Sequence, residues 1–128
     1  MSGVDTVQVF YDAIPRGDLP AALGVLADDV RWTESDGFPY AGTYVGPDAV
    51  RDGVFARLGS EWDPFVLDVE ELIDGGDTVV AIGTYSGTYR ATGKTMRARV
   101  AHVWKLRDGK AVSFEQFVDT AAVAAALA

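Results

Sequence analysis

The chain has 128 residues and a formal net charge of −8, which argues against binding to nucleic acids or anionic membranes, because such binders present basic patches. It contains no cysteine, so disulfides, thiolate metal sites and a catalytic thiol are excluded, and a reducing, cytoplasmic location is expected. The sequence has no run near the ~20 apolar residues of a membrane span and no signal-peptide pattern, and we expect residues 1–128 to form a single domain.

Helices are predicted in the first quarter of the chain. Apolar residues recur at three- and four-residue spacing over 4–14, which predicts a helix that Pro15 and Gly17 end. Asp18 is expected to cap a second short helix with Pro20 in its first turn.

The next segment mixes short strands with a third helix. Residues 30–34 are typical of a short strand, and 35–46, rich in Gly, Pro and aromatic residues, predict a loop with a short strand at 41–45. A helix is expected to begin at Gly46-Pro47-Asp48, to run through Leu58 and to end at Gly59.

The second half of the chain has β character. Four runs rich in β-forming residues, separated by short Gly-containing turns, are expected as strands at 65–73, 78–89, 95–106 and 111–118. An alanine-rich helix follows from Thr120. Helices followed by a meander predict an α+β fold, in which the helices pack on one face of a curved, mostly antiparallel sheet and enclose an apolar pocket.

Three polar residues fall in apolar rows of the predicted strands, so they are expected to face inward. His102, the single histidine, lies between Val100 and Trp104 on one strand face. Gln116 shares a row with apolar residues of the last strand, and Glu34 shares a face with Trp32. An acid, an imidazole and an amide are therefore predicted to converge on one aromatic-lined space.

This set of side chains is suited to proton transfer. Burial raises the pKa of a carboxyl, which makes Glu34 a better base near neutral pH. His102 can donate to a developing oxyanion or accept a proton, and Gln116 can orient a substrate or a water molecule. Structural alternatives stay open: His102 as a satisfied core residue, and Glu34 paired with His102 or an arginine. One histidine and scattered carboxylates do not form a metal site, so no metal and no cofactor are expected.

The chain resembles the SnoaL-like and ketosteroid-isomerase-like proteins from about Val7 to Ala122. The residues that carry the resemblance are Gly17-Asp18-Leu19, 26–32, 42–47, Val79-Val80, Gly93-Lys94, His102-Val103-Trp104, Asp108-Gly109-Lys110 and 114–120. The resemblance implies a cystatin-like α+β cone: a strongly bent sheet with N-terminal helices packed on its concave face around an apolar pocket.

The resemblance also implies roles for individual residues. Glu34 falls where the isomerases keep an aspartate base, and His102 where they keep a protonated aspartate that donates to the oxyanion. Phe10 falls at their oxyanion-hole tyrosine but has no hydroxyl, and Tyr11 points about 100° further round the helix. In the polyketide cyclases a histidine corresponds to His102 and a catalytic aspartate to Gln116, which cannot act as an acid.

The function predicted from these features is acid–base proton transfer next to a carbonyl of a small apolar, aromatic or polycyclic molecule: isomerisation, cyclisation or dehydration. Glu34, His102 and Gln116 are the candidate catalytic residues. The expected pocket walls are Phe10, Trp32, Phe38, Tyr40, Tyr44, Phe55, Val100, Trp104, Phe114 and Val118, with Tyr44 also a candidate hydroxyl donor.

Two other classes of function stay open. The first is a non-catalytic ligand-binding or accessory protein on the same fold. The second is a dimerising module, because Phe117 and Val103 are predicted on the outer face of the sheet, where a homodimer interface would lie.

Overall fold

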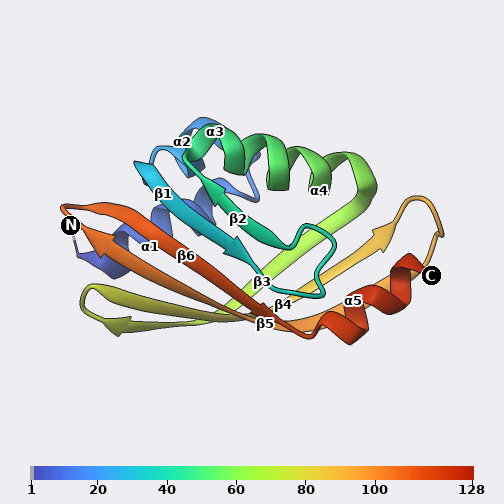
Figure 1. Cartoon of the computed structure of the whole chain (residues 1–128). Coiled ribbons are helices and arrows are strands. Elements are labelled where there is room, and N and C mark those ends of the chain that lie inside the picture. The colour runs from blue at the N-terminus through green and yellow to red at the C-terminus, as the bar shows by residue number, and fades with distance from the viewer. Residues whose placement is uncertain (1) are drawn as a thin grey trace.

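A bent six-stranded sheet with helices packed against it forms the α+β fold of the computed structural model, which describes residues 2–128 (Figure 1). The strands are β1 (Leu26–Glu34), β2 (Gly42–Val45), β3 (Trp62–Gly75), β4 (Thr78–Tyr89), β5 (Thr95–Arg107) and β6 (Lys110–Val118). The helices are α1 (Gly3–Ala13), α2 (Leu19–Leu23), α3 (Pro47–Val50), the π-helical turn η1 (Arg51–Phe55), α4 (Ala56–Glu61) and α5 (Thr120–Leu127).

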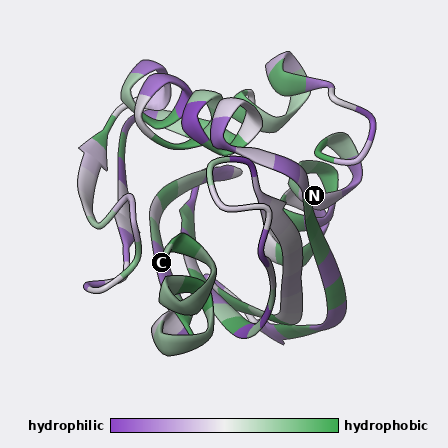
Figure 2. Ribbon diagram, turned by 90° about the vertical axis from the view of Figure 1, so that its right-hand side faces the viewer, coloured by the Kyte–Doolittle hydropathy of each residue, from purple (hydrophilic) through white to green (hydrophobic). Residues whose placement is uncertain are grey.

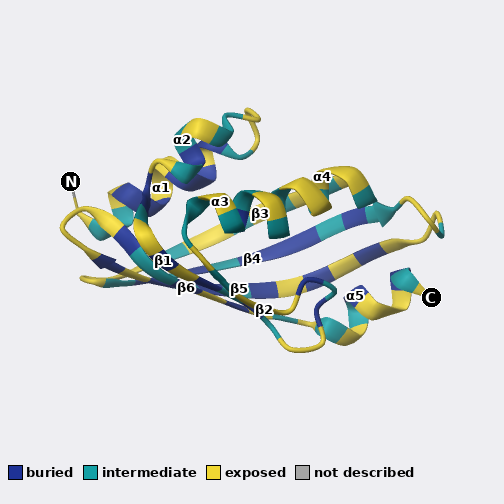
Figure 3. Ribbon diagram, turned by 45° about the horizontal axis from the view of Figure 1, so that its top comes forward, coloured by how far each residue is buried: buried dark blue, intermediate teal, exposed yellow. Residues whose placement is uncertain are grey.

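The sheet has the order β2-β1-β6-β5-β4-β3, and all neighbouring strands are antiparallel except β1 and β6. β3 to β6 form a meander in chain order, as the turn signals predicted. Buried residues alternate with less buried ones along most of β4 and along β5 (Figure 3), so one face of each strand packs inward. Figure 2 shows the corresponding alternation of hydrophilic and hydrophobic residues along the strands.

Helices cover the inward face from three sides. α1 packs against β3, β4 and β6, and its buried Val7, Phe10 and Tyr11 form part of a first hydrophobic cluster. The continuous α3–η1–α4 segment lies above the sheet (Figure 1) and contacts β1, β2 and β3. α5 packs on β5 and β4, where Val123 and Ala126 join a second cluster. The predicted arrangement of helices on the concave face is confirmed.

Several expected boundaries need correction. The first strand begins at Leu26, four residues before the expected start, because its first part continues past a register shift against β6. The third helix does not end at Gly59 but continues to Glu61, and β3 follows directly at Trp62. The expected caps are present: Asp18 accepts a hydrogen bond from the N–H of Ala21, as does Asp119 from that of Ala122.

A π-helical turn interrupts the third helix at Arg51–Phe55. Such turns are rare in proteins, and many of those that occur lie near functional sites. Gly53 lies in this turn against the ring of Tyr44 on β2. A Cβ atom at Gly53 would come within 2.4 Å of Tyr44 Cε1, so the close approach requires glycine. The turn directs Val54 and Phe55 toward the sheet.

Among residues 2–128, no helix combines the length and the apolar character needed to cross a membrane. Within the same range, no three histidine or acidic side chains lie together as a metal site.

Candidate functional site

A small chamber lies between the helices and the inward face of the sheet. Its volume is about 90 Å³, and its walls are formed by Phe10, Ile14, Trp32, Glu34, Val54, Phe55, Leu58, Phe65, Leu67, Tyr85, His102 and Phe114. Nine of these residues are apolar or carry only an indole N–H, so the polar chemistry of the chamber is confined to Glu34, Tyr85 and His102.

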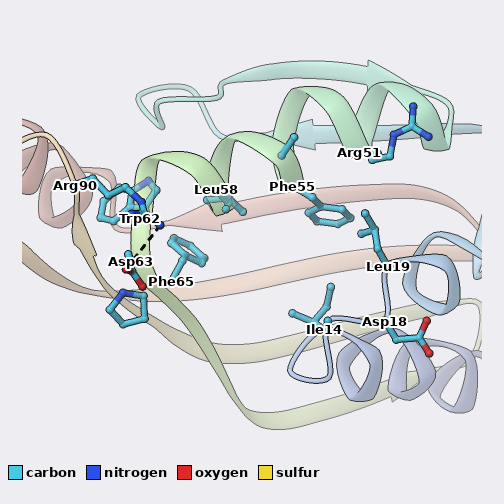
Figure 4. A pocket seen from close by; sticks show the side chains of 14 residues that line it. Ile14, Asp18, Leu19, Arg51, Phe55, Leu58, Trp62, Asp63, Phe65 and Arg90 are labelled. Atoms are coloured by element: carbon cyan, nitrogen blue, oxygen red, sulfur yellow. Dashed lines mark ion pairs between the residues drawn. The ribbon is translucent and has the colours of Figure 1, made fainter.

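A larger outer pocket of about 490 Å³ adjoins the chamber (Figure 4). The two share Ile14, Phe55, Leu58 and Phe65, so these four side chains lie between the chamber and the outer pocket. Charged side chains lie further out: Asp18, Arg51, Asp63 and Arg90. A ligand that reaches the chamber from this side passes between aromatic and aliphatic walls.

Glu34 is the last residue of β1, and its side chain is only 3% exposed. Two residues earlier, Trp32 stacks on Phe114 of β6 with ring centroids 3.6 Å apart, which fixes this end of β1 against the chamber. Strand alternation places Trp32 and Glu34 on the same face, as predicted.

The carboxyl of Glu34 has no compensating charge. Its Oε2 atom has no hydrogen-bond partner among residues 2–128. Burial penalises the carboxylate and raises the pKa of Glu34 from 4.5 to about 8, and the nearby Trp32 indole offsets part of this rise. The Trp32 indole N–H itself has no hydrogen-bond partner among residues 2–128. Glu34 is therefore poised to exchange a proton near neutral pH.

His102 lies on β5, directly opposite Gln116 of β6, and both side chains are buried. Tyrosine hydroxyls contact both ring nitrogens: Tyr11 lies 2.6 Å from Nδ1, and Tyr85 lies 2.7 Å from Nε2. Burial lowers the pKa of His102 from 6.5 to about 3, so the ring is neutral at physiological pH.

Hydrogen bonds extend from both tyrosines to further side chains. The indole N–H of Trp104 donates to the Tyr11 hydroxyl over 2.8 Å. The amide nitrogen of Gln116 donates to the Tyr85 hydroxyl over 2.9 Å, while its Oε1 accepts from the backbone N–H of Ser35 over 3.2 Å. The Ser35 hydroxyl also donates to the backbone carbonyl of Gln116. His102 and Gln116 are thus joined through Tyr85.

Residues 7–114 match the SnoaL-like domain. The chain belongs to the SnoaL-like family. An NTF2-like protein from Burkholderia thailandensis E264 is 47% identical, with a TM-score of 0.98 over 100% of this chain and 98% of that chain. TerC, crystallised with polyporic acid, is 27% identical, with a TM-score of 0.87 over 97% of this chain and 96% of that chain.

A curated relative is Patulin synthesis protein F from Aspergillus clavatus, which is 37% identical over 70 residues. The match covers 48% of this chain and 35% of the relative, so the chain matches about a third of that protein. These findings establish the SnoaL-like fold.

The structure of this SnoaL-like chain brings together part of the predicted site. Glu34 and His102 line the chamber, and Gln116 lies behind Tyr85. Of the expected walls, Phe10, Trp32, Phe55 and Phe114 line the chamber. The other six do not: Phe38, Tyr40, Tyr44, Val100, Trp104 and Val118.

Each of these six residues has a different place in the fold. Phe38, Tyr40 and Val100 belong to the second hydrophobic cluster, and Val118 packs against it. Tyr44 is half-buried, and its hydroxyl donates to the Tyr40 carbonyl, so it is not directed into the chamber. Trp104 packs behind the chamber wall against the rings of Phe10, Trp32 and Phe114, and its indole N–H donates to Tyr11.

Two tyrosines of the site were not predicted. Tyr85 lies in the inward row of β4 with Val79 and Ala81, a row that strand alternation could have revealed. Tyr11 is directed away from the chamber wall, as its position beside Phe10 on α1 indicated, but its hydroxyl reaches His102. The hydrogen bonds of the His102 ring therefore come from two phenols on different elements.

Proposed function

We propose that the protein catalyses proton transfer at a carbon next to a carbonyl group, with Glu34 as the base. The observation that supports this most is a buried, unpaired carboxyl in the wall of a largely apolar chamber. An unpaired buried acid is costly, so a role in stability does not explain it. Isomerisation, cyclisation and dehydration all begin with this step.

The environment of Glu34 suits the step. A base with a pKa of about 8 is stronger than an ordinary carboxylate and still partly ionised near neutral pH. The carboxylate takes the proton from carbon, the C–H electron pair forms a C=C bond, and negative charge develops on the carbonyl oxygen. The neutral hydrogen-bonding groups around His102 and Gln116 are suited to stabilise that oxygen.

The shape of the site supports an apolar, ring-containing substrate. The chamber of about 90 Å³ is smaller than the roughly 150 Å³ cavity that accepts benzene, so it fits a reacting carbonyl end but not a whole ring system. The remainder of such a molecule would lie beside Phe55 and Phe65, which line both spaces, and extend into the outer pocket of about 490 Å³. Polyporic acid, the molecule crystallised with TerC, supports a small organic ligand.

The second candidate is a ligand-binding protein without catalysis. One observation favours it: both ring nitrogens of His102 are already engaged by tyrosines, so the imidazole does not present a free nitrogen to a ligand. A binding protein needs the chamber but has no use for a carboxyl of raised pKa. The two candidates therefore differ in the role of Glu34.

Deuterium exchange into 2-tetralone, an apolar bicyclic ketone, tests the proposal. Wild-type protein in D₂O should accelerate exchange at the carbons next to the carbonyl, and Glu34→Gln should lower the rate at least 100-fold. Glu115→Gln, which removes an exposed carboxylate on β6, is the matched control and should keep the wild-type rate. Binding of 2-tetralone without exchange would favour the binding protein, and equal accelerated rates for wild type and Glu34→Gln would reject Glu34 as the base.

We also propose a homodimer formed through the outer face of the sheet. Phe117 is 50% exposed there, next to Ala101 in the register of β5 and β6, and Ile82 of β4 lies beside Ala101. Phe117→Lys should shift the protein from dimer to monomer in sedimentation velocity. A monomeric wild-type protein would contradict this proposal.

A further inference from the structure

Five buried side chains form one hydrogen-bonded chain, Trp104–Tyr11–His102–Tyr85–Gln116, which we call the Tyr–His–Tyr chain. Both of its ends are donors. The Trp104 indole can only donate. The Gln116 amide presents its NH₂ group to Tyr85, because its oxygen accepts from the backbone N–H of Ser35.

The protons of the Tyr–His–Tyr chain outnumber its internal hydrogen bonds. Two contacts join the three central groups, Tyr11 to His102 and His102 to Tyr85. The neutral imidazole carries one N–H, and each phenol carries one O–H, which makes three protons. Since the two ends already donate inward, one proton is left over and must point out of the chain.

The tautomer of His102 decides which of the two phenols directs its O–H out of the Tyr–His–Tyr chain. If Nδ1 carries the hydrogen, it donates to Tyr11, and the Tyr11 O–H has to find another acceptor. If Nε2 carries it, the ring donates to Tyr85, Tyr11 donates to Nδ1, and the Tyr85 O–H is free to point elsewhere.

The surroundings of the two phenols differ. The Tyr11 hydroxyl is buried behind the chamber wall, and its only hydrogen-bond partners among residues 2–128 are His102 and Trp104. Tyr85 lines the chamber together with Glu34. Burial raises the pKa of Tyr85, and the negative charge of an ionised Glu34 adds to the rise. Only Tyr85 can direct a free O–H toward a ligand.

We propose that Tyr85 is the catalytic hydrogen-bond donor to the carbonyl oxygen of the substrate, and that His102, as the Nε2–H tautomer, is its positioning residue. The inference rests on the proposed function for its reaction and on the proton count for its geometry. Gln116 and His102 both donate to the Tyr85 oxygen, so its single proton is directed into the chamber.

The step keeps protons and charge in balance. Glu34 takes the proton from carbon and becomes neutral, and the charge moves to the substrate oxygen. That oxygen accepts the hydrogen bond from Tyr85, whose own oxygen is polarised by the donors from His102 and Gln116. When Glu34 returns its proton to a carbon of the substrate, the charge disappears and the Tyr–His–Tyr chain is unchanged.

Nitrogen NMR of the wild-type protein tests the tautomer without any substitution. His102 is the single histidine, so ¹⁵N-histidine labelling gives one ring, and long-range proton–nitrogen correlations show which nitrogen is protonated. We expect a protonated Nε2 and an unprotonated Nδ1 at pH 7. A protonated Nδ1 would place the extra proton on Tyr11 and overturn the assignment.

Binding of 4-nitrophenol tests the donor itself, because its anion imitates the charged substrate oxygen and absorbs differently from the neutral form. Wild-type protein should bind the 4-nitrophenol anion more tightly than the neutral phenol. Tyr85→Phe should reduce this preference about tenfold or more, whereas the matched control Tyr44→Phe, which removes a tyrosine hydroxyl outside the chamber, should change it less than about threefold. Equal losses in the two variants, or no preference for the anion in wild type, would overturn the proposal.

The outcomes separate this inference from the proposed function. A protonated Nε2 and a Tyr85-dependent preference for the anion, without ketone exchange, would make Tyr85 the oxygen-binding group of a non-catalytic protein. Ketone exchange that depends on Glu34 but is unaffected by Tyr85→Phe would leave the proposed function standing and reject Tyr85 as the donor.

Discussion

Substitution of Glu34 by glutamine should stabilise the fold in a pH-dependent way. The pKa of Glu34 is 4.5 in its ordinary state and about 8 in the fold, because burial disfavours the charge. Between these values the unfolded chain releases the proton and the folded chain keeps it, so stability falls as pH rises, by about 1.4 kcal/mol per unit. Because the slope is only about half this value at pH 4.5 itself, the loss from pH 4.5 to 7 amounts to about 3 kcal/mol, and it levels off above about pH 8.

Urea unfolding of both proteins from pH 4.5 to 9 measures this effect. The difference in unfolding free energy, Glu34→Gln minus wild type, should grow by about 3 kcal/mol between pH 4.5 and 7. Using the difference removes the contributions of other titrating groups. The exposed Glu115 provides the control: the unfolding free energy of Glu115→Gln minus that of wild type should change little over the same pH range. A constant difference for Glu34→Gln would show that the buried carboxyl carries no such penalty and would refute the reasoning.

Three further outcomes follow from the structure. The rate of ketone exchange should rise with pH and level off above about pH 8, because the ionised form of Glu34 is the base; a rate that falls over pH 6–8 would contradict this. Gly53→Ala should lower the unfolding free energy by about 1–2 kcal/mol in urea, since the added Cβ would lie 2.4 Å from the Tyr44 ring, and an unchanged midpoint would show that the ring yields. Asp119→Ala should lower the unfolding free energy by about 1 kcal/mol through loss of the α5 cap, whereas Asp119→Asn should retain most of the stabilisation by the cap.

Strand alternation was sufficient to predict the inward face of the sheet. It placed His102 and Gln116 in the inward rows of their hairpin, and both side chains are buried there. These predictions succeed because the period of a strand is fixed by the backbone and does not depend on distant contacts.

The tyrosine contacts of His102 depend on tertiary structure and were beyond reach. Tyr85 reaches His102 diagonally, since the residue opposite His102 on β4 is Ala81, and this follows only from the strand register. Tyr11 reaches it through the docking of α1 on the sheet. Likewise, nothing local assigns Tyr40 to the cluster under α5 instead of the chamber wall.

The ionisation of Glu34 tests the central claim most directly. Carbon NMR of protein labelled at the glutamate δ-carbon, with Glu34→Gln to assign the signal, gives the titration of this side chain alone. A midpoint near pH 8 is predicted, from burial of an unpaired carboxyl beside the chamber. A midpoint near 4.5 would show that the carboxyl is solvated or paired, and it would contradict Glu34 as a base tuned by its environment.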